Sequence, residues 1–270
     1  MSLEYMELAR TAAARIANVT GVEKHDIALT LGSGWGGAAD LIGEVVAEVP
    51  AEEIPGFSKA AVEGHGGKLT SIRLTSGKHA LVLGARTHYY ESKDVRAVAH
   101  GVRTAAEAGA EICILTNGCG STRANVGPGS AVLISDHINL TATSPLEGAN
   151  FVDLTDLYSQ RLRRIAHSVD PHLGEGVYVQ FPGPHYETPA EVQMAARLGG
   201  DLVGMSTALE AIAVREVGME LLGISLVTNL AAGVAAESLN HTDVLEAGKA
   251  AGPRISQLLA DIIDQIVKDL

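Results

Sequence analysis

The chain is poor in several kinds of residue, and each scarcity excludes a class of protein. It has two cysteines among 270 residues, Cys113 and Cys119, and these fit neither a disulfide framework nor a zinc-ligand spacing. Both are therefore expected to be reduced thiols. Aromatic residues make up only 4%, which argues against stacking platforms for single-stranded nucleic acid. The net charge is −12, from 20 Lys and Arg against 32 Asp and Glu, and no basic cluster occurs, so no nucleic-acid partner is expected.

Long apolar runs are also missing. No stretch of roughly 18 apolar residues occurs, so no membrane span is expected. The segment 1–21 reads as an acidic amphipathic helix, without the basic start and apolar core of a secretory signal. Together with the reduced cysteines, these features predict a cytoplasmic protein that binds no membrane.

What the sequence does contain is an alternation of short β-rich runs with helical patterns, which is typical of α/β proteins. A hydrophobic content of 46% over 270 residues suffices for one large core, and no repeat or linker interrupts the chain. A single domain over residues 1–270 is therefore expected. Strands are predicted over 26–31, 111–118, 130–140, 176–184, 201–206 and 221–229, and helices over 96–109, 157–169, 189–200 and 208–219.

Three further segments shape the expected fold. Segment 67–86 reads as two strands joined around Ser76 and Gly77, a hairpin signal that makes the sheet mixed. Apolar residues at helical spacing from Ile255 onward predict a C-terminal helix, and Pro253 is expected to break or kink the helical stretch before it. Segment 48–56 is expected to be a loop.

The stretch 31–37, LGSGWGG, follows a predicted strand, and Gly32, Gly34 and Gly37 fit the pattern G-x-G-x-x-G. The pattern alone permits a dinucleotide site, a phosphate site or a plain tight turn. The hairpin disfavours the dinucleotide interpretation, which needs successive parallel βαβ units. A nicotinamide-dependent oxidoreductase nevertheless stays an alternative at this point.

Polar residues gather where predicted strands end. Arg86, His88 and Tyr90 alternate and would share one face if this segment is extended. The arginine fork suits phosphate oxygens, although a solvent-facing strand edge would also explain the alternation. Gly118 could leave a backbone N–H group free for an anion. Ser206 begins a helix, where capping and anion binding can coexist.

Three further polar residues follow, of which the pair Glu187 and Asn229 suits a flat heterocycle. Glu187 lies in a proline-bounded loop, Asn229 ends an apolar strand, and His241 precedes a helix. A surface turn, a closing turn and a helix cap are the plain alternatives for these three residues. The motifs H-E-x-x-H, G-x-S-x-G and G-x-x-x-x-G-K-[ST] are absent, which disfavours a zinc protease, a serine hydrolase and a P-loop NTPase, and no metal site is expected.

These stretches together resemble the trimeric, low-molecular-mass purine nucleoside phosphorylases, and most closely the bacterial type that prefers 6-oxopurines. The resemblance rests on LGSGWGG, GHGGK, GARTHYYE, LTNGCGS, SDHINLTATSPL, PGPHYETPAE, DLVGMST, LVTNLAAG and NHTDVLEAGK, in family order from about residue 26 to 250. It implies a single-domain α/β fold with a mixed, distorted, barrel-like sheet flanked by helices, and a homotrimer. It also implies reversible phosphorolysis of purine (2′-deoxy)ribonucleosides in purine salvage, with inorganic phosphate as a substrate and no cofactor.

The resemblance also implies roles for individual residues. Phosphate would be bound by Ser33, Arg86, His88, Gly118, Ser206 and, at the edge of the site, His65. Ribose would contact Tyr90, Met205 and His241, and the purine would contact Tyr186, Glu187, Thr228 and Asn229. The catalytic residues would be Asn229, Glu187 and His88, and Phe151 would close the ribose site of a neighbouring subunit.

The chain departs from the family pattern at two places. Gly118-Cys119 stands where the family often has two alanines, which keeps backbone donation and places a thiol at the site. Trp35 stands where leucine is frequent, which affects packing more than chemistry. Relatives that act on methylthioadenosine carry Asp at the position of Asn229, so the asparagine favours 6-oxopurines. A nucleoside-binding protein without catalysis stays open as a further alternative.

Overall fold

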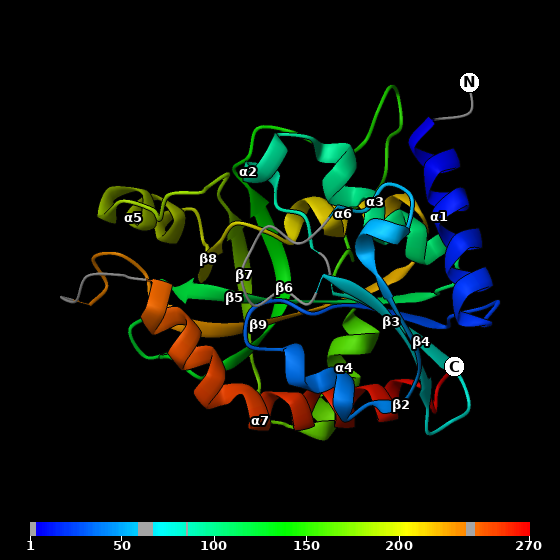
Figure 1. Ribbon diagram of the computed structural model, residues 1–270. Helices are drawn as coiled ribbons and strands as arrows, with labels where there is room; N and C mark the ends of the chain where they lie inside the picture. The colour runs from blue at the N-terminus through cyan, green and yellow to red at the C-terminus, as the bar shows by residue number, and fades with distance from the viewer. Residues whose placement is uncertain (1–3, 59–66, 85, 236–240) are drawn as a thin grey trace.

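The computed structural model describes residues 4–58, 67–84, 86–235 and 241–270, with the backbone alone for 241–244 (Figure 1). The strands are β1 (Ile27–Thr30), β2 (Gly43–Pro50), β3 (Lys68–Leu74), β4 (His79–Leu83), β5 (Ile112–Ser121), β6 (Ala131–Asn139), β7 (Gly174–Gln180), β8 (Leu202–Gly204) and β9 (Glu220–Leu230). The helices are α1 (Glu4–Thr20), α2 (Tyr89–Ser92), α3 (Val95–Glu107), α4 (Gln160–Val169), α5 (Pro189–Arg197), α6 (Ala208–Glu216) and α7 (His241–Ile266), with 3₁₀ turns η1 (Gly36–Asp40) and η2 (Ala51–Glu53).

Part of the sheet closes on itself. β5 pairs with β8, β8 with β7, β7 with β6, β6 with β9, and β9 returns to β5. The remaining strands extend from β5 in the order β1, β4, β3, β2. Parallel and antiparallel pairs occur together, and β3 and β4 form the antiparallel hairpin predicted at 67–86. The expected mixed, barrel-like α/β fold is confirmed.

Helices cover both faces of the sheet, and each face has its own core. Figure 1 shows α1, α3 and α6 on one side and α4 and α7 on the other. Ile16, Val102 and Val214 anchor the first core, whereas Leu162 and Leu259 belong to the second. The amphipathic patterns of the sequence are satisfied because each apolar stripe meets one face of the sheet.

Two predictions about single elements were wrong. Glu48 to Pro50, expected in a loop, end the edge strand β2, which pairs antiparallel with β3. Segment 86–90 is not extended throughout, because His88 caps the short helix α2 that contains Tyr90. The alternation of polar residues therefore does not arise from one strand face.

Pro253 does not end a helix, because α7 continues through it to Ile266. Figure 1 shows that α7 changes direction along its length, between its orange and its red part. The alternative of a break at Pro253 is therefore wrong, and a bend within α7 agrees with the expected kink. Loss of the proline N–H and a clash with the preceding turn are the usual causes of such bends.

Candidate active site

A cavity of about 340 Å³ lies at one edge of the sheet, where the predicted polar clusters meet. β4, β1, β5 and β9 run parallel to their neighbours in this order, so their carboxyl ends share an edge. Ser33 and Arg86 lie beyond these ends, Gly118 and Asn229 lie in the last four residues of β5 and β9, and all four residues line the cavity. Open α/β sheets commonly bind ligands at such an edge, and the volume suits a small molecule.

The short strand β8 brings a second group to the same place. Its residue Val203 pairs with Gly120 near the end of β5, so Met205 and Ser206, which follow β8, lie beside Gly118 and line the cavity. The predicted cavity residues are Ser33, Arg86, His88, Tyr90, Gly118, Tyr186, Glu187, Met205, Ser206, Thr228 and Asn229, and the structure brings all of them together.

Arg86 is buried and fixed on one side. Its Nε donates to Glu210 Oε1 at 3.1 Å, and Nη1 donates to the carbonyl oxygen of Thr116 at 2.6 Å. Its Nη2 is buried and has no hydrogen-bond partner among the described residues. A buried donor without a partner is costly, so this group is suited to an anionic ligand.

His88 and Tyr90 line the cavity side by side although they do not share a strand. Their rings stack with centroids 4.8 Å apart and planes 12° from parallel. Burial, together with the positive charge of Arg86, lowers the pKa of His88 to about 3. Its imidazole is therefore neutral at physiological pH, and Nδ1 lies 3.1 Å from Glu91 Oε1.

The glycine stretch at 31–37 packs tightly against β5. A Cβ on Gly32 would lie 2.6 Å from the carbonyl oxygen of Thr116 and 2.8 Å from Arg86 Nη1, so only glycine fits there. Trp35 is buried and donates from Nε1 to the carbonyl oxygen of Asn117 at 3.0 Å. The stretch leads into the 3₁₀ turn η1 rather than the α-helix that a dinucleotide site requires. This context removes the structural basis of the dinucleotide interpretation.

The purine side of the predicted site has a buried acid and an oriented amide. Glu187 is 7% exposed, not on the surface, and its Oε1 has no hydrogen-bond partner among the described residues. Burial raises the pKa of this carboxyl above its usual range. Thr228 donates from Oγ1 to Asn229 Oδ1 at 2.9 Å, and the amide Nδ2 of Asn229 donates to the carbonyl oxygen of Leu230 at 3.0 Å.

Of the other three predicted residues, the structure describes the side chain of Phe151 alone. Phe151 is 93% exposed and does not line the cavity. His65 lies outside the described residues. The backbone of His241 begins α7, but its side chain lies outside the described part.

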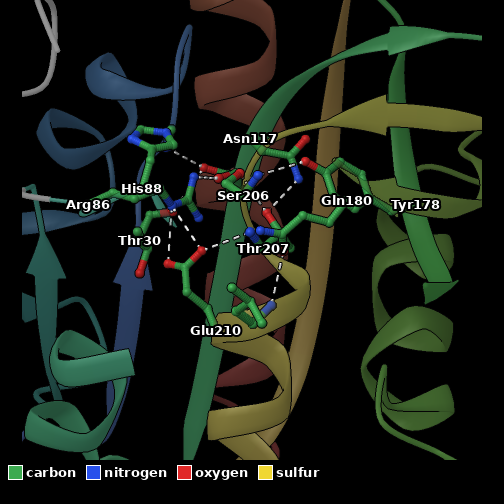
Figure 2. Close-up of polar contacts among 12 residues, drawn as sticks. Thr30, Arg86, His88, Asn117, Tyr178, Gln180, Ser206, Thr207 and Glu210 are labelled. Carbon is green, nitrogen blue, oxygen red and sulfur yellow. Dashed lines mark hydrogen bonds and ion pairs between the residues drawn. The ribbon is translucent and has the colours of Figure 1, made fainter. Parts of the chain in front are cut away.

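Asn117 and Glu210 were missed by the sequence interpretation. Asn117 lines the cavity from inside β5 and donates from Nδ2 to Thr207 Oγ1 at 2.9 Å. Glu210 lies below it in the first turn of α6, as Figure 2 shows. The only signal for Glu210 was its capping spacing to Thr207, which by itself indicates a helix start.

Cys119 lines the cavity, but its thiol is poorly suited to redox chemistry. Burial raises the pKa of Cys119 to about 12, so the reactive thiolate is scarce at neutral pH. Among the described residues, no group of three or more His, Cys, Asp or Glu side chains could hold a metal ion.

None of the helices in the described part of the chain is long and apolar enough to cross a membrane.

Comparisons with known proteins agree with this geometry. The sequence model of the family described as the phosphorylase superfamily matches residues 26–264. Purine nucleoside phosphorylase of Cellulomonas sp. is 69% identical over 259 residues, which cover 94% of this chain and 92% of the relative. The enzyme of the same name from Mycobacterium tuberculosis is 55% identical over 258 residues, covering 95% and 96%.

A solved structure extends the agreement to the backbone. Purine nucleoside phosphorylase of Schistosoma mansoni in complex with inosine superposes with a TM-score of 0.88 at 30% identity, covering 97% of this chain and 98% of that one. The shared sequence and the shared fold together lead to one conclusion: the chain belongs to the purine nucleoside phosphorylase family, within the phosphorylase superfamily.

Proposed function

We propose that this chain catalyses the reversible phosphorolysis of 6-oxopurine nucleosides and 2′-deoxynucleosides in the cavity described above. Phosphate attacks C1′ of the sugar, the bond from C1′ to the purine nitrogen breaks, and the products are the free base and (2-deoxy)ribose 1-phosphate. The reaction needs no cofactor, because phosphate is itself the nucleophile. Such cleavage passes through a transition state that resembles an oxocarbenium ion.

The observation that carries the proposal is that one cavity gathers two chemically different sets of groups. Ser33, Arg86, Gly118 and Ser206 offer donors that suit an anion, and we assign them to the phosphate end. Glu187 and Asn229 offer an acceptor and an amide that suit the edge of a heterocycle, and we assign them to the purine end. A nucleoside lying between them places its glycosidic bond beside the phosphate.

At the phosphate end, catalysis is positioning and electrostatics. The bound phosphate holds negative charge beside the cation that develops on the sugar, which lowers the barrier without a catalytic carboxylate pair. Neutral His88 and its stacked neighbour Tyr90 border this end, and Tyr90, Met205 and His241 are the proposed ribose contacts. His65 is proposed as a further phosphate contact.

At the purine end, the leaving base gathers negative charge as the bond breaks. Asn229 donates to N7, and the carboxylate of Glu187 accepts from N1–H of a 6-oxopurine, while Tyr186 and Thr228 border the ring. Bonds that strengthen in the transition state accelerate the reaction. A 6-aminopurine has no N1 proton, so the carboxylate disfavours adenosine relative to inosine and guanosine.

Solved relatives support purine nucleosides as the substrate class. Schistosoma structures include complexes with inosine, guanosine and adenosine, so the preference for 6-oxopurines rests on Glu187 and Asn229. We further propose that the chain forms a homotrimer in which Phe151 closes the ribose site of a neighbouring subunit, and that the protein is cytoplasmic.

The test is a coupled assay that detects release of hypoxanthine from inosine. Base release that saturates with phosphate, continues with arsenate and stops without either anion is the expected result. A protein that binds inosine without releasing base would instead be a nucleoside-binding protein. Release that is independent of phosphate would be hydrolysis and would contradict the proposal, as would adenosine cleavage at a rate comparable to that of inosine.

A further inference from the structure

Glu210 is a buried acid that does not line the cavity but contacts two groups that do. Its carboxylate accepts from Arg86 Nε at 3.1 Å and from the backbone N–H of Thr207 at 3.0 Å, through Oε1 and Oε2 respectively (Figure 2). The side chains of Arg86 and Glu210 are 2% and 4% exposed. One carboxylate therefore joins the loop after β4 to the turn before α6.

The turn that Glu210 contacts is strained. Thr207 has φ 78° and ψ −52°, and the N–H of Ala208 donates to the carbonyl oxygen of Ser206 at 3.0 Å, which together describe a γ-turn. A β-branched residue rarely adopts positive φ, and such strain costs on the order of 1–3 kcal/mol unless the surroundings enforce it. Here Glu210 holds the N–H of Thr207, and Asn117 holds its hydroxyl.

The same contacts leave one donor of the turn for a ligand. The N–H of Ser206 lies 3.3 Å from Tyr178 Oη, the N–H of Thr207 donates to Glu210, and the N–H of Leu209 donates to Gln180 Oε1 at 3.1 Å. The backbone donors at this helix start are thus already used. What the turn offers to the cavity is the hydroxyl of Ser206, whose Oγ lies 3.0 Å from Thr207 Oγ1, so its direction depends on how Thr207 is held.

Charge gives the carboxylate a second effect. Glu210 and Arg86 are buried as an ion pair, so the carboxylate compensates the guanidinium in the wall of the cavity, while Nη2 keeps no partner among the described residues. A lone buried guanidinium would be expensive, and without Glu210 it would keep only the hydrogen bond from Nη1 to the carbonyl oxygen of Thr116. The pair fixes the plane of the guanidinium through Nε.

We propose that Glu210 is a positioning residue for the phosphate end of the cavity. Its one carboxylate holds both Arg86 and the turn that carries the Ser206 hydroxyl in place. This inference rests on the proposed function, because it takes phosphate as the ligand of those two groups. Glutamine at this position accepts only one of the two hydrogen bonds, since its amide nitrogen would face a donor. Aspartate keeps the charge but is one methylene shorter and does not reach both donors.

The test compares Glu210→Gln with Glu216→Gln in the full chain. Glu216 lies at the other end of α6 and forms a similar buried pair with Arg103, at 2.7 Å, outside the cavity. Phosphate KM at saturating inosine and hypoxanthine Kd without phosphate are measured for each, with melting temperature as the measure of stability. We expect Glu210→Gln to raise the phosphate KM about tenfold or more and to leave the hypoxanthine Kd within about twofold. Glu216→Gln should lower the melting temperature and leave the phosphate KM unchanged.

Several outcomes would overturn the inference alone. These are a phosphate KM within about twofold of wild type in Glu210→Gln, or an equal rise in both variants, which would indicate general loosening. If Glu210→Gln does not fold, Glu210→Asp decides in the same way, with an unchanged phosphate KM against the inference. Phosphate-independent cleavage by the wild-type chain would instead overturn the proposed function, and this inference with it.

Discussion

Two buried acids of the site differ in what their oxygens contact. Both oxygens of Glu210 accept hydrogen bonds from the protein, whereas Oε1 of Glu187 has no partner within the described residues. An unsatisfied buried carboxylate oxygen costs about 1–3 kcal/mol or more. Glu187 is therefore arranged to accept from a ligand, and Glu210 to hold its neighbours.

The raised pKa of Glu187 predicts an acid limit on purine binding. The ionised carboxylate is the better acceptor for N1–H, so affinity is full above the raised pKa and weakens as pH falls through it. Because burial raises this pKa, the weakening starts at a higher pH than for an exposed glutamate. Hypoxanthine Kd measured across acidic and neutral pH should show this acid limb, that is, a rise of Kd as the pH falls through the pKa of Glu187.

Glu187→Gln is the control for that limb. His88 titrates near pH 3, below the range in question, so it does not contribute. The variant should bind hypoxanthine weakly at every pH, with the limb gone. A limb of the same position in Glu187→Gln would assign it to another group.

Asn229 is predicted to act mainly on the chemical step. Thr228 donates to its Oδ1 and the carbonyl oxygen of Leu230 accepts from Nδ2, so the amide is oriented, and its second N–H is the proposed donor to the leaving base. Asn229→Ala should lower kcat for inosine by on the order of a hundredfold, as removal of other donors aimed at developing charge does. Steady-state kinetics with inosine and phosphate measure this, and an unchanged kcat would remove Asn229 from the mechanism.

At the scale of elements, most strands and helices could be predicted because their apolar patterns are strong. β5 begins with the apolar run Ile112–Leu115 and β9 is mostly apolar, and α3 and α4 are amphipathic with caps at Asp94 and Ser159. The edge strand β2 could not be predicted in the same way. Its exposed Glu44, Val46 and Glu48 give no regular buried face, and its pairing with β3 is a tertiary contact.

The residues of the site also differ in how well the sequence predicts them. Residues at strand ends, such as Arg86 and Asn229, could be predicted because their chemistry is unusual for a turn, and the resemblance supplied their roles. Asn117 was missed because it lies inside a strand, where the β5 pattern explains it without a ligand. Its importance depends on Thr207, which is 90 residues away along the chain and 2.9 Å away in space.

The packing of the glycine stretch against β5 predicts a contrast between two substitutions. Gly32→Ala would press its Cβ against Thr116 and Arg86, so it should cost roughly 2 kcal/mol or more and displace the phosphate donors. Gly36→Ala is the matched control, because no atom of the described residues would lie within 4 Å of its Cβ and its φ is not positive. Its effect should stay within about 0.5 kcal/mol.

Urea unfolding and phosphate KM measure the two consequences of Gly32→Ala separately. Both should change for Gly32→Ala and neither for Gly36→Ala. Equal stability of the two variants would mean that the close approach of Gly32 to Thr116 is not a constraint on this backbone.

At the scale of the whole molecule, the loop before Phe151 is fastened while Phe151 itself is exposed. Arg96 donates to Glu147 through Nη2 at 2.8 Å, Arg103 donates to the carbonyl oxygen of Pro145 at 2.8 Å, and Asn150 donates to Glu216 at 3.2 Å. Phe151, at the end of this loop, is 93% exposed, so its ring is accessible to another molecule. The proposed homotrimer would cover it.

If Phe151 acts in a neighbouring subunit, two defective chains should complement each other. Phe151→Ala should raise the inosine KM about tenfold or more, and Asn229→Ala should lower kcat, so each variant alone is weak. Mixed oligomers would contain some sites in which the cavity keeps Asn229 and the adjacent chain keeps Phe151. Dissociating the two variants together and reassembling them should therefore give more activity at low inosine than the sum of the two reassembled separately. Because a residue acting within its own chain cannot be supplied by a neighbour, strictly additive activity in oligomers shown to be mixed would place Phe151 outside the site.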